Sequence, residues 1–250
     1  CKHKEWRQMN SAFVLRLGSG AAAKLRVGSK AALLDQAARA GLAVPKGVIL
    51  RDTVADLAVL HGAVVQTESG LRIIDPAKLM ELLQLPDFEG EVAVRSAFSA
   101  EDTESRSFAG YFRTELNIDA GNPVTFSDAL EKVWASARAP HLTKTAEFAS
   151  EQEPLRRDVL VMRMVNAERA GAAFSEREFE DDLVNHTHGT AERLLAGEIA
   201  GESITLPKLR GWEKSALPAG LPPWAVRLQR LLRDIRRWLG NQDWDVEWAD

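Results

Sequence analysis

Residues 92–112 read VAVRSAFSAEDTESRSFAGYF, and no other stretch of the chain says as much about its fold. The apolar residues at its start end a buried strand, Arg95 follows them directly, and a loop of small and hydroxyl residues comes next. A fixed guanidinium beside a loop rich in backbone N–H and hydroxyl donors suits a polyphosphate, because charge-assisted hydrogen bonds hold oxyanions best. The pattern is compatible with a phosphate-binding loop, although most serine-rich loops are solvated surface loops, which is the plainer alternative.

A second informative stretch, DWDVEWA at residues 243–249, alternates carboxylates with bulky apolar residues. Because successive side chains of a strand point to opposite faces, Asp243, Asp245 and Glu247 would share one face. Stacked carboxylates repel one another unless solvent or a cation intervenes, and hard oxygen ligands suit Mg²⁺. An amphipathic edge strand with a charged solvent face is the alternative. A phosphate loop and a magnesium strand in one chain together indicate a Mg-nucleotide site.

These motifs resemble the phosphoenolpyruvate synthase and pyruvate phosphate dikinase family, in its N-terminal nucleotide-binding domain. VAVRSAFSAEDTESRSFAGYFRTELNI is similar to that family's phosphate-loop segment, and DWDVEWA is similar to its metal-binding strand. VGSKAALLDQAARAGLAVPKGVIL resembles the N-terminal signature, and VLVMRMVNAERAGAAFS resembles the adenine-side strand and the strand after it. The matches follow the family's order and span residues 13–250.

The resemblance implies a mixed α/β (α+β) fold of the ATP-grasp type, in which two lobes sandwich a nucleotide. It implies that Lys30 and Arg95 bind and neutralise the phosphates of ATP, and that Asp245 and Glu247 hold Mg²⁺. It assigns further contacts with ATP to the phosphate loop, the adenine-side strand and one glutamate, which are Ser96, Ser107, Gly110, Arg163, Met164, Val165 and Glu192.

By the same resemblance, the chain is an ATP-dependent phosphotransferase module. It would transfer a phosphoryl group from Mg-ATP to a histidine on a separate swivelling domain, in cis or in trans, which then serves a small acceptor such as pyruvate. Catalysis would consist of positioning and charge neutralisation, the usual requirements of phosphoryl transfer. The alternative function is a degenerate, non-catalytic nucleotide-binding or regulatory module, which an altered turn at residues 189–192 and an acidic run at residues 176–182 favour.

Several charged residues have plainer interpretations beside the functional ones. Lysine at a helix start opposes the helix dipole, which favours function for Lys30. Glu192 is equally consistent with a surface helix residue. His186 and His188 are interpreted as loop histidines, since no third metal ligand has suitable spacing. The arginines of residues 227–237 are interpreted as a solvated face paired with nearby acids.

Composition narrows the function classes. The 250 residues are 45% hydrophobic, enough for one large core or two lobes, and the net charge of −4 gives no basic excess for nucleic acid or an anionic membrane surface. No apolar run reaches membrane-spanning length and no signal peptide is visible, so we expect a cytoplasmic protein. The single cysteine, Cys1, excludes an intramolecular disulfide and a cysteine-based zinc site.

The apolar period predicts helices at residues 29–40, 53–61, 73–85, 126–139 and 224–239, and strands at residues 12–17, 48–50, 92–94, 159–165, 171–174 and 243–249. Asp52 or Thr53 is expected to cap the second helix, and Asp75-Pro76 is expected to start the third. We expect residues 1–11 to be a flank, residues 12–115 to carry the phosphate loop, and residues 116–250 to carry the adenine-side and metal strands. By comparison with the family pattern, the module is expected to be truncated at its C-terminus.

Overall fold

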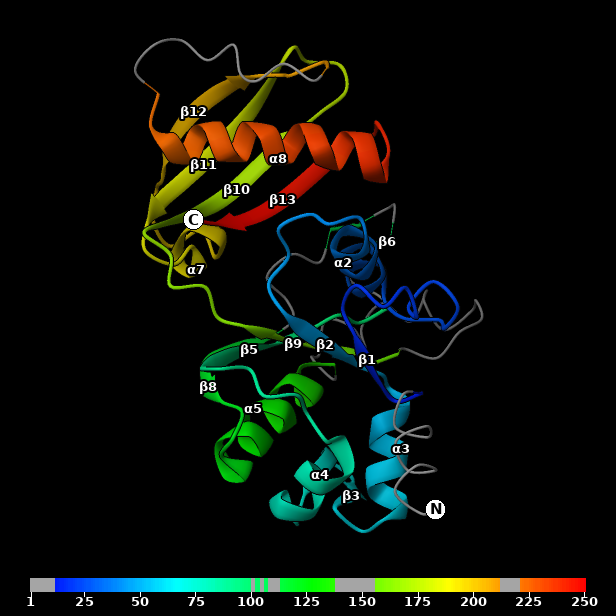
Figure 1. Ribbon diagram of the computed structural model, residues 1–250. Coiled ribbons are helices and arrows are strands. Elements are labelled where there is room, and N and C mark those ends of the chain that lie inside the picture. The colour runs from blue at the N-terminus through cyan, green and yellow to red at the C-terminus, as the bar shows by residue number, and fades with distance from the viewer. Residues whose placement is uncertain (1–11, 100–101, 104–105, 108–112, 138–155, 212–220) are drawn as a thin grey trace. The chain divides into compact units, whose positions relative to one another are not determined.

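The computed structural model describes residues 12–99, 102–103, 106–107, 113–137, 156–211 and 221–250 (Figure 1). The chain divides into two compact units. Unit 1 comprises Cys1–Arg39 and Val44–Met164, and unit 2 comprises Ala40–Ala43 and Val165–Asp250. The boundary between the units follows Met164, because segments after residue 115 complete the sheet and the core of unit 1.

Unit 1 is built on a five-stranded antiparallel sheet. Its strand order is β1 (Val14–Arg16), β2 (Gly47–Leu50), β9 (Val159–Arg163), β5 (Glu91–Ser96) and β8 (Thr114–Asp119). The central strands β2 and β9 carry apolar side chains on both faces, and helices cover each face of the sheet. The strands predicted at residues 12–17, 48–50, 92–94 and 159–165 are thus confirmed, with ends shifted by a few residues.

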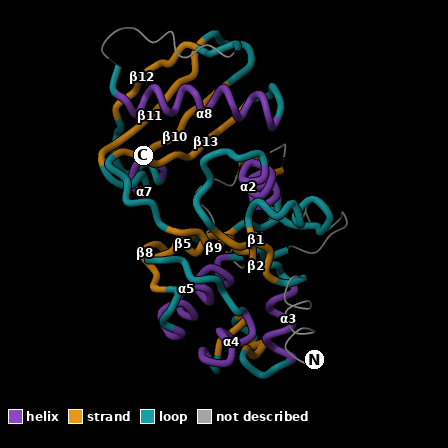
Figure 2. The backbone as a smooth tube through the Cα atoms, in the orientation of Figure 1, coloured by secondary structure: helices purple, strands orange, loops and turns teal. Residues whose placement is uncertain are grey.

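Helices lie on both sides of this sheet (Figure 2). Three of them, α3 (Thr53–Leu60), α4 (Pro76–Leu83) and α5 (Pro123–Ser136), pack with Val48, Val94 and Val161 in what we call the α5-side core. On the opposite face, α2 (Ser29–Arg39) packs through Ala31 with Ile49 and Leu160 in the α2-side core. Each fully buried aliphatic side chain stabilises the folded state by about 1.5–3 kcal/mol, so the two cores fix both helix layers to the sheet.

The starts of two helices in unit 1 can be compared with the sequence prediction. Helix α4 begins at Pro76, where Asp75 caps it by accepting a hydrogen bond from the Lys78 N–H at 3.0 Å. The start predicted at Asp75-Pro76 is confirmed, whereas Ile73, the first residue of the predicted range, instead ends a hairpin of β3 (Val64–Thr67) and β4 (Gly70–Ile73). At α3, Asp52 occupies the cap position, yet its side chain makes no cap hydrogen bond.

Unit 2 is a four-stranded antiparallel sheet with one long helix across it (Figure 1). Its strand order is β12 (Glu202–Pro207), β11 (Asp181–His188), β10 (Arg169–Ser175) and β13 (Trp244–Ala249). Helix α8 (Pro223–Leu239) buries Leu228 and Leu232 against Ala173 and Val184 of the sheet, and Leu42 packs on the same core. The short helix α7 (Glu192–Leu195) joins β11 to β12. The predicted mixed α/β class is confirmed.

One arginine of α8 is buried in an ion pair, against the prediction of a solvated row. Arg236 Nη1 lies 3.0 and 2.9 Å from the two carboxylate oxygens of Asp182, which is fully buried, and 2.8 Å from Ser175 Oγ. The prediction was wrong here because position 236 lies one helical turn after the fully buried Leu232, on the side of α8 that faces the sheet. The expected pairing with a neighbouring acid is present at Arg233, whose Nε lies 2.8 Å from Asp234 Oδ1.

The two histidines predicted in a loop lie in strand β11 instead. His186 is 1% exposed and meets the ring of Trp224 edge-on, with 4.6 Å between ring centroids. Arg169 donates toward both rings, with Nη1 at 3.0 Å from His186 Nδ1 and Nη2 at 2.9 Å from His188 Nε2. These two ring nitrogens must therefore act as acceptors, which assigns a neutral tautomer to each histidine.

Among the helices of the described segments, none combines the length and the apolarity that a bilayer crossing requires.

Candidate nucleotide-binding site

The first part of the candidate site lies on the α2 side of the sheet in unit 1. Along β5, Val92 and Val94 point into the α5-side core, so the alternation of strand side chains places Arg95 on the other face. The register agrees, because Arg95 is paired with Leu160, which belongs to the α2-side core. Arg95 is half-buried there, and placing a cation in such surroundings is costly unless anions compensate it.

Lys30 lies on the same side, in the first turn of α2. That first turn contains no acidic residue, so the positive end of the helix dipole and the lysine both favour an anion. The chain just before the helix approaches the end of β5 closely, since a Cβ on Gly28 would lie 2.1 Å from the Ala97 carbonyl oxygen. Only glycine allows this approach. Gly28 lies two residues before Lys30, and Ala97 lies two residues after Arg95. This contact therefore brings together the two segments that carry the predicted phosphate-binding residues.

The remaining phosphate-loop residues are placed differently. Ser96 is 4% exposed, and its register partner Val159 belongs to the α5-side core, so its hydroxyl lies on the face opposite Arg95. Ser107 lies in the short strand β7 (Arg106–Ser107), paired with Asp102 of β6 (Asp102–Thr103). Gly110 lies outside the described residues. The structure thus does not bring the Ser96 hydroxyl to Arg95.

The predicted adenine-side residues occupy the end of β9 and the segment after it. Arg163 is exposed, is the register partner of Val92, and has its Nη1 3.8 Å from Glu89 Oε2. That register places the Arg163 side chain on the face opposite Arg95. Met164 is the last residue of unit 1, and Val165, which is exposed, is the first residue of the second segment of unit 2. The chain passes from one unit to the other at this predicted adenine contact.

The predicted metal pair lies in unit 2, on the face of the sheet that α8 leaves open. Trp248 and Val246 pack under α8, while Asp245 and Glu247 alternate with them and are exposed. Asp243 precedes the strand, where its Oδ1 accepts a hydrogen bond from the Arg177 N–H at 2.7 Å. No three His, Cys, Asp or Glu side chains gather into a possible metal site within the described segments. Two carboxylates are nevertheless sufficient for Mg²⁺ when substrate phosphates supply further oxygen ligands.

Two apolar residues beside the metal pair were missed by sequence reasoning. Phe174 of β10 is the register partner of both Asp245 and Leu183, and Leu183 is 45% exposed. They lie on the open face, and an exposed apolar surface beside carboxylates suits a ligand with a flat apolar part and an anionic part that a cation bridges to the carboxylates. The signal that could have found them is the alternation along β10 and β11, which leaves these two apolar residues on the outward face.

Glu192 is the first residue of α7 and is exposed. It belongs to unit 2 together with Asp245 and Glu247, whereas Lys30 and Arg95 belong to unit 1. Each unit by itself therefore carries one chemically distinct part of the predicted site, a pair of cations in the first and carboxylates in the second.

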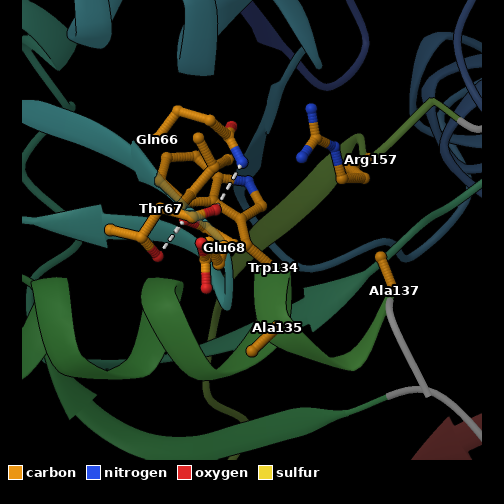
Figure 3. Close-up of a pocket in the computed structure, with 9 residues that line it drawn as sticks. Gln66, Thr67, Glu68, Trp134, Ala135, Ala137 and Arg157 are labelled. Carbon is orange, nitrogen blue, oxygen red and sulfur yellow. Dashed lines mark hydrogen bonds between the residues drawn. The ribbon is translucent and has the colours of Figure 1, made fainter. Parts of the chain in front are cut away.

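A hollow of about 470 Å³ in unit 1 contains none of the predicted residues (Figure 3). It lies between the β3–β4 hairpin and α5, and Gln66, Trp134 and Arg157 contribute to its wall. Trp134 belongs to the α5-side core, so this hollow is on the other side of the sheet from Lys30 and Arg95. We assign the candidate site by its charged residues rather than by the size of this hollow.

Residues 77–219 match the family described as pyruvate phosphate dikinase, AMP/ATP-binding domain, which covers more than half of the chain. The chain belongs to this family. The family resemblance and the ATP-grasp type of fold predicted from the motifs are thereby confirmed. The chain is a nucleotide-binding module of a phosphotransferase family, as the sequence predicted.

Three similar proteins illustrate the range of the family. The uncharacterized phosphotransferase YvkC of Bacillus subtilis is 28% identical over 123 residues, which are 47% of this chain and 14% of that protein. The phosphoenolpyruvate synthase of Pyrococcus furiosus is 29% identical over 124 residues, covering 47% of this chain and 15% of the synthase. The prodigiosin synthesizing transferase PigC of Serratia marcescens is 27% identical over 224 residues, covering 81% of this chain and 24% of PigC. The chain thus matches only a small part of much longer relatives.

Proposed function

We propose that this chain binds Mg-ATP and performs the ATP half of a phosphoryl transfer. The observation that carries the proposal is the close contact of Gly28 with the Ala97 carbonyl, which gathers the segments bearing Lys30 and Arg95 on one face of the unit 1 sheet. Two cations carried on adjoining segments match the negative charge of a polyphosphate chain. Membership in an AMP/ATP-binding family supports the nucleotide as the ligand.

The proposed roles follow from charge and geometry. Lys30 and Arg95 bind phosphate oxygens and neutralise the charge that spreads over them during transfer. Asp245 and Glu247 hold Mg²⁺, which when bound supplies further neutralisation of the phosphates. Phe174 and Leu183 give the open face of unit 2 an apolar surface beside those carboxylates.

The phosphoryl acceptor is proposed to be a histidine on a separate swivelling domain, which passes the group to a small molecule such as pyruvate. The relatives support a further domain, because the chain matches 14–24% of their lengths. Their names differ, since one is a phosphoenolpyruvate synthase and another a prodigiosin synthesizing transferase. We therefore propose that phosphoryl transfer to a histidine is the step that the relatives share, and that the final acceptor differs among them.

The structure bears on the alternative of a degenerate, non-catalytic module. One argument for it was the acidic run at residues 176–182. The last residue of that run, Asp182, is buried and paired with Arg236, so this acidic residue has a structural role in unit 2. The altered turn at residues 189–192 is the remaining argument for the non-catalytic alternative.

Isothermal titration of the full chain tests the proposal. We expect ATP to bind in the presence of Mg²⁺ and much more weakly in EDTA, because phosphates and the carboxylate pair repel each other without a cation. Lys30→Ala should weaken Mg-ATP binding about tenfold or more, as loss of a charged hydrogen bond does. Lys78→Ala is the matched control, because Lys78 also lies in the first turn of a helix of unit 1 and is exposed. Equal affinity with and without Mg²⁺, or equal affinity of the Lys30 variant and its control, would contradict the proposal.

A further inference from the structure

One fully buried carboxylate of unit 1 lies where three segments of the chain meet. Asp158, 0% exposed, directly precedes β9. Its Oδ2 accepts a hydrogen bond from the Gly28 N–H at 2.8 Å, and its Oδ1 accepts one from the Asp52 N–H at 2.9 Å. Its backbone carbonyl accepts a third, from the Ala97 N–H at 2.9 Å. One residue thus ties together the chain before α2, the chain after β2 and the chain after β5.

Two of these segments carry the proposed phosphate-binding cations. The Gly28 carbonyl accepts the Ala32 N–H at 3.0 Å, so the residue that Asp158 holds is the one on which α2 begins. The hydrogen bond from Ala97 extends the pairing of β5 with β9 past Ser96, and Ser99 continues it by donating to the Arg156 carbonyl at 3.1 Å. Asp158 therefore fixes both the start of the helix and the direction in which the chain leaves β5.

The electrostatics of Asp158 point away from a purely stabilising role. Burial is the largest influence on its carboxyl and raises its pKa, although the hydrogen bonds from Asp52 and Gly28 act in the opposite sense. An acid whose pKa is raised by folding stabilises the fold below its ordinary pKa, and that contribution is lost as the pH rises through the folded value. At neutral pH the ionised group is therefore costly to bury, a condition that is common at functional positions.

We infer that Asp158 is a positioning residue of the proposed nucleotide site, which holds the Lys30-bearing start of α2 against the Arg95-bearing end of β5. The inference rests on the proposed function, because the two cations matter only if they bind the same phosphates. Asp158 itself does not touch the nucleotide. Its effect on binding passes through the placement of Lys30, and a displacement of a binding group by about 1 Å is enough to weaken its contribution strongly.

The chain offers a matched control for a buried carboxylate. Asp35 is 1% exposed, and its oxygens accept backbone N–H groups of Gly18, Gly20 and Ala22 at 2.8, 3.2 and 3.1 Å. It thus fastens a loop to α2 with the same kind of hydrogen bonds. Its hydrogen bonds do not involve Gly28 or the end of β5, so its loss should not change the placement of Lys30 relative to Arg95.

The test compares Asp158→Asn with Asp35→Asn in the full chain, by thermal melting and by titration with Mg-ATP. Asparagine keeps the volume of the side chain but turns one acceptor oxygen into an NH2 donor, which then faces a backbone N–H. We expect both variants to melt at lower temperature and only Asp158→Asn to bind Mg-ATP more weakly, by about three- to tenfold. In the Lys30→Ala background, Asp158→Asn should cause little further loss, since residues that act through one another are not additive.

Hydrogen exchange adds a readout that does not depend on the nucleotide. Asp158→Asn should speed the exchange of the Gly28 or Asp52 amide, because only one acceptor oxygen remains for the two N–H groups. Asp35→Asn should leave both amides unchanged. If Asp158→Asn does not fold, Asp158→Glu replaces it in the same tests. It keeps the charge and both acceptors but displaces them by one methylene, so weaker binding that depends on Lys30 is again expected.

The outcomes separate the inference from the proposed function. If Lys30→Ala weakens Mg-ATP binding while folded Asp158→Asn binds like the wild type, the inference is overturned and the proposed function stands. An equal loss for Asp35→Asn, or a loss that is fully additive with Lys30→Ala, also overturns the inference, because it shows a general effect of stability. If Lys30→Ala itself binds like the wild type, both the phosphate assignment and the inference are overturned.

Discussion

Replacing Arg236 by alanine should destabilise unit 2 by about 2–4 kcal/mol. Asp182 is fully buried, and the guanidinium of Arg236 is its main partner, at 3.0 and 2.9 Å. Removing one partner of a buried ion pair typically costs about 3–5 kcal/mol, because the other charge remains buried. The Lys208 ammonium, 3.9 Å from Asp182 Oδ1, stays in place and should offset about 1 kcal/mol of this, the upper range for a loosely placed pair.

Urea unfolding followed by tryptophan fluorescence measures this change, because Trp224, Trp244 and Trp248 all lie in unit 2. The transition of each unit is fitted separately, since one two-state transition is not assured for a chain of two units. Arg230→Ala is the matched control on the same helix, because Arg230 is exposed, and it should change the free energy of unfolding by less than about 0.5 kcal/mol.

A double variant, Asp182→Leu with Arg236→Met, distinguishes the buried charge from the loss of packing. Replacing both members of a buried pair by apolar residues is often neutral, so the double variant should recover most of the lost stability. The reasoning would be refuted if Arg236→Ala resembled Arg230→Ala. It would also be refuted if the double variant were no more stable than the single one.

Three further predictions concern the proposed site and the histidine cluster. Arg95→Ala should leave the melting temperature nearly unchanged and weaken Mg-ATP binding by about 1.5–3 kcal/mol. Arg95→Lys should restore only part of the lost binding free energy, because lysine cannot make a bidentate contact. An Arg95→Ala variant that melts at lower temperature but binds Mg-ATP with unchanged affinity would contradict the phosphate role. In the metal strand, Glu247→Gln should weaken Mg-ATP binding in a titration. Asp243→Asn should not weaken it, since the asparagine oxygen can still accept the hydrogen bond that Asp243 accepts from the Arg177 N–H. Equal effects of the two variants would show that the strand acts only through its total charge. Burial and the neighbouring Arg169 lower the pKa of His186 below its ordinary value of 6.5. Its contribution to stability is therefore complete above about pH 6.5 and is lost as the pH falls through the folded pKa. The urea midpoint should fall in acid, and by less in His186→Gln, whereas an equal fall in the wild type and the variant would assign the effect to other groups.

Elements with a clear apolar period could be predicted from the sequence. The helix Ser29–Arg39 ends just before Gly41, whose φ of +81° requires a left-handed conformation, and Trp224 to Leu239 was identified from its one-sided apolar face. The alternation of Asp245 and Glu247 with buried neighbours was likewise readable from the strand period. In these segments the local pattern and the tertiary packing agree, so the local pattern was sufficient.

The failures occur where burial depends on a partner far away in the sequence. The inward face of β11 carries Asp182, His186 and His188 as well as Val184, so polarity along this strand does not alternate in the usual way. Asp182 and His186 are buried because α8 and β10 supply their partners, whereas His188, at the end of the strand, is exposed. Asp158 shows the same effect, since its side-chain partners lie 130 and 106 residues away in the sequence. No local window contains the information that such a carboxylate is buried.

The division of the chain between its units has a consequence for synthesis on the ribosome. Residues 40–43 belong to unit 2, although they emerge more than a hundred residues before the rest of that unit, which begins at Val165. The edge strand that completes its sheet, Trp244–Ala249, emerges last. At a synthesis rate of about 5–20 residues per second, roughly 10–40 s pass between the synthesis of Leu42 and that of the last apolar residues of its core. During that interval Leu42 lacks the core that buries it in the folded chain, so the nascent chain exposes this leucine.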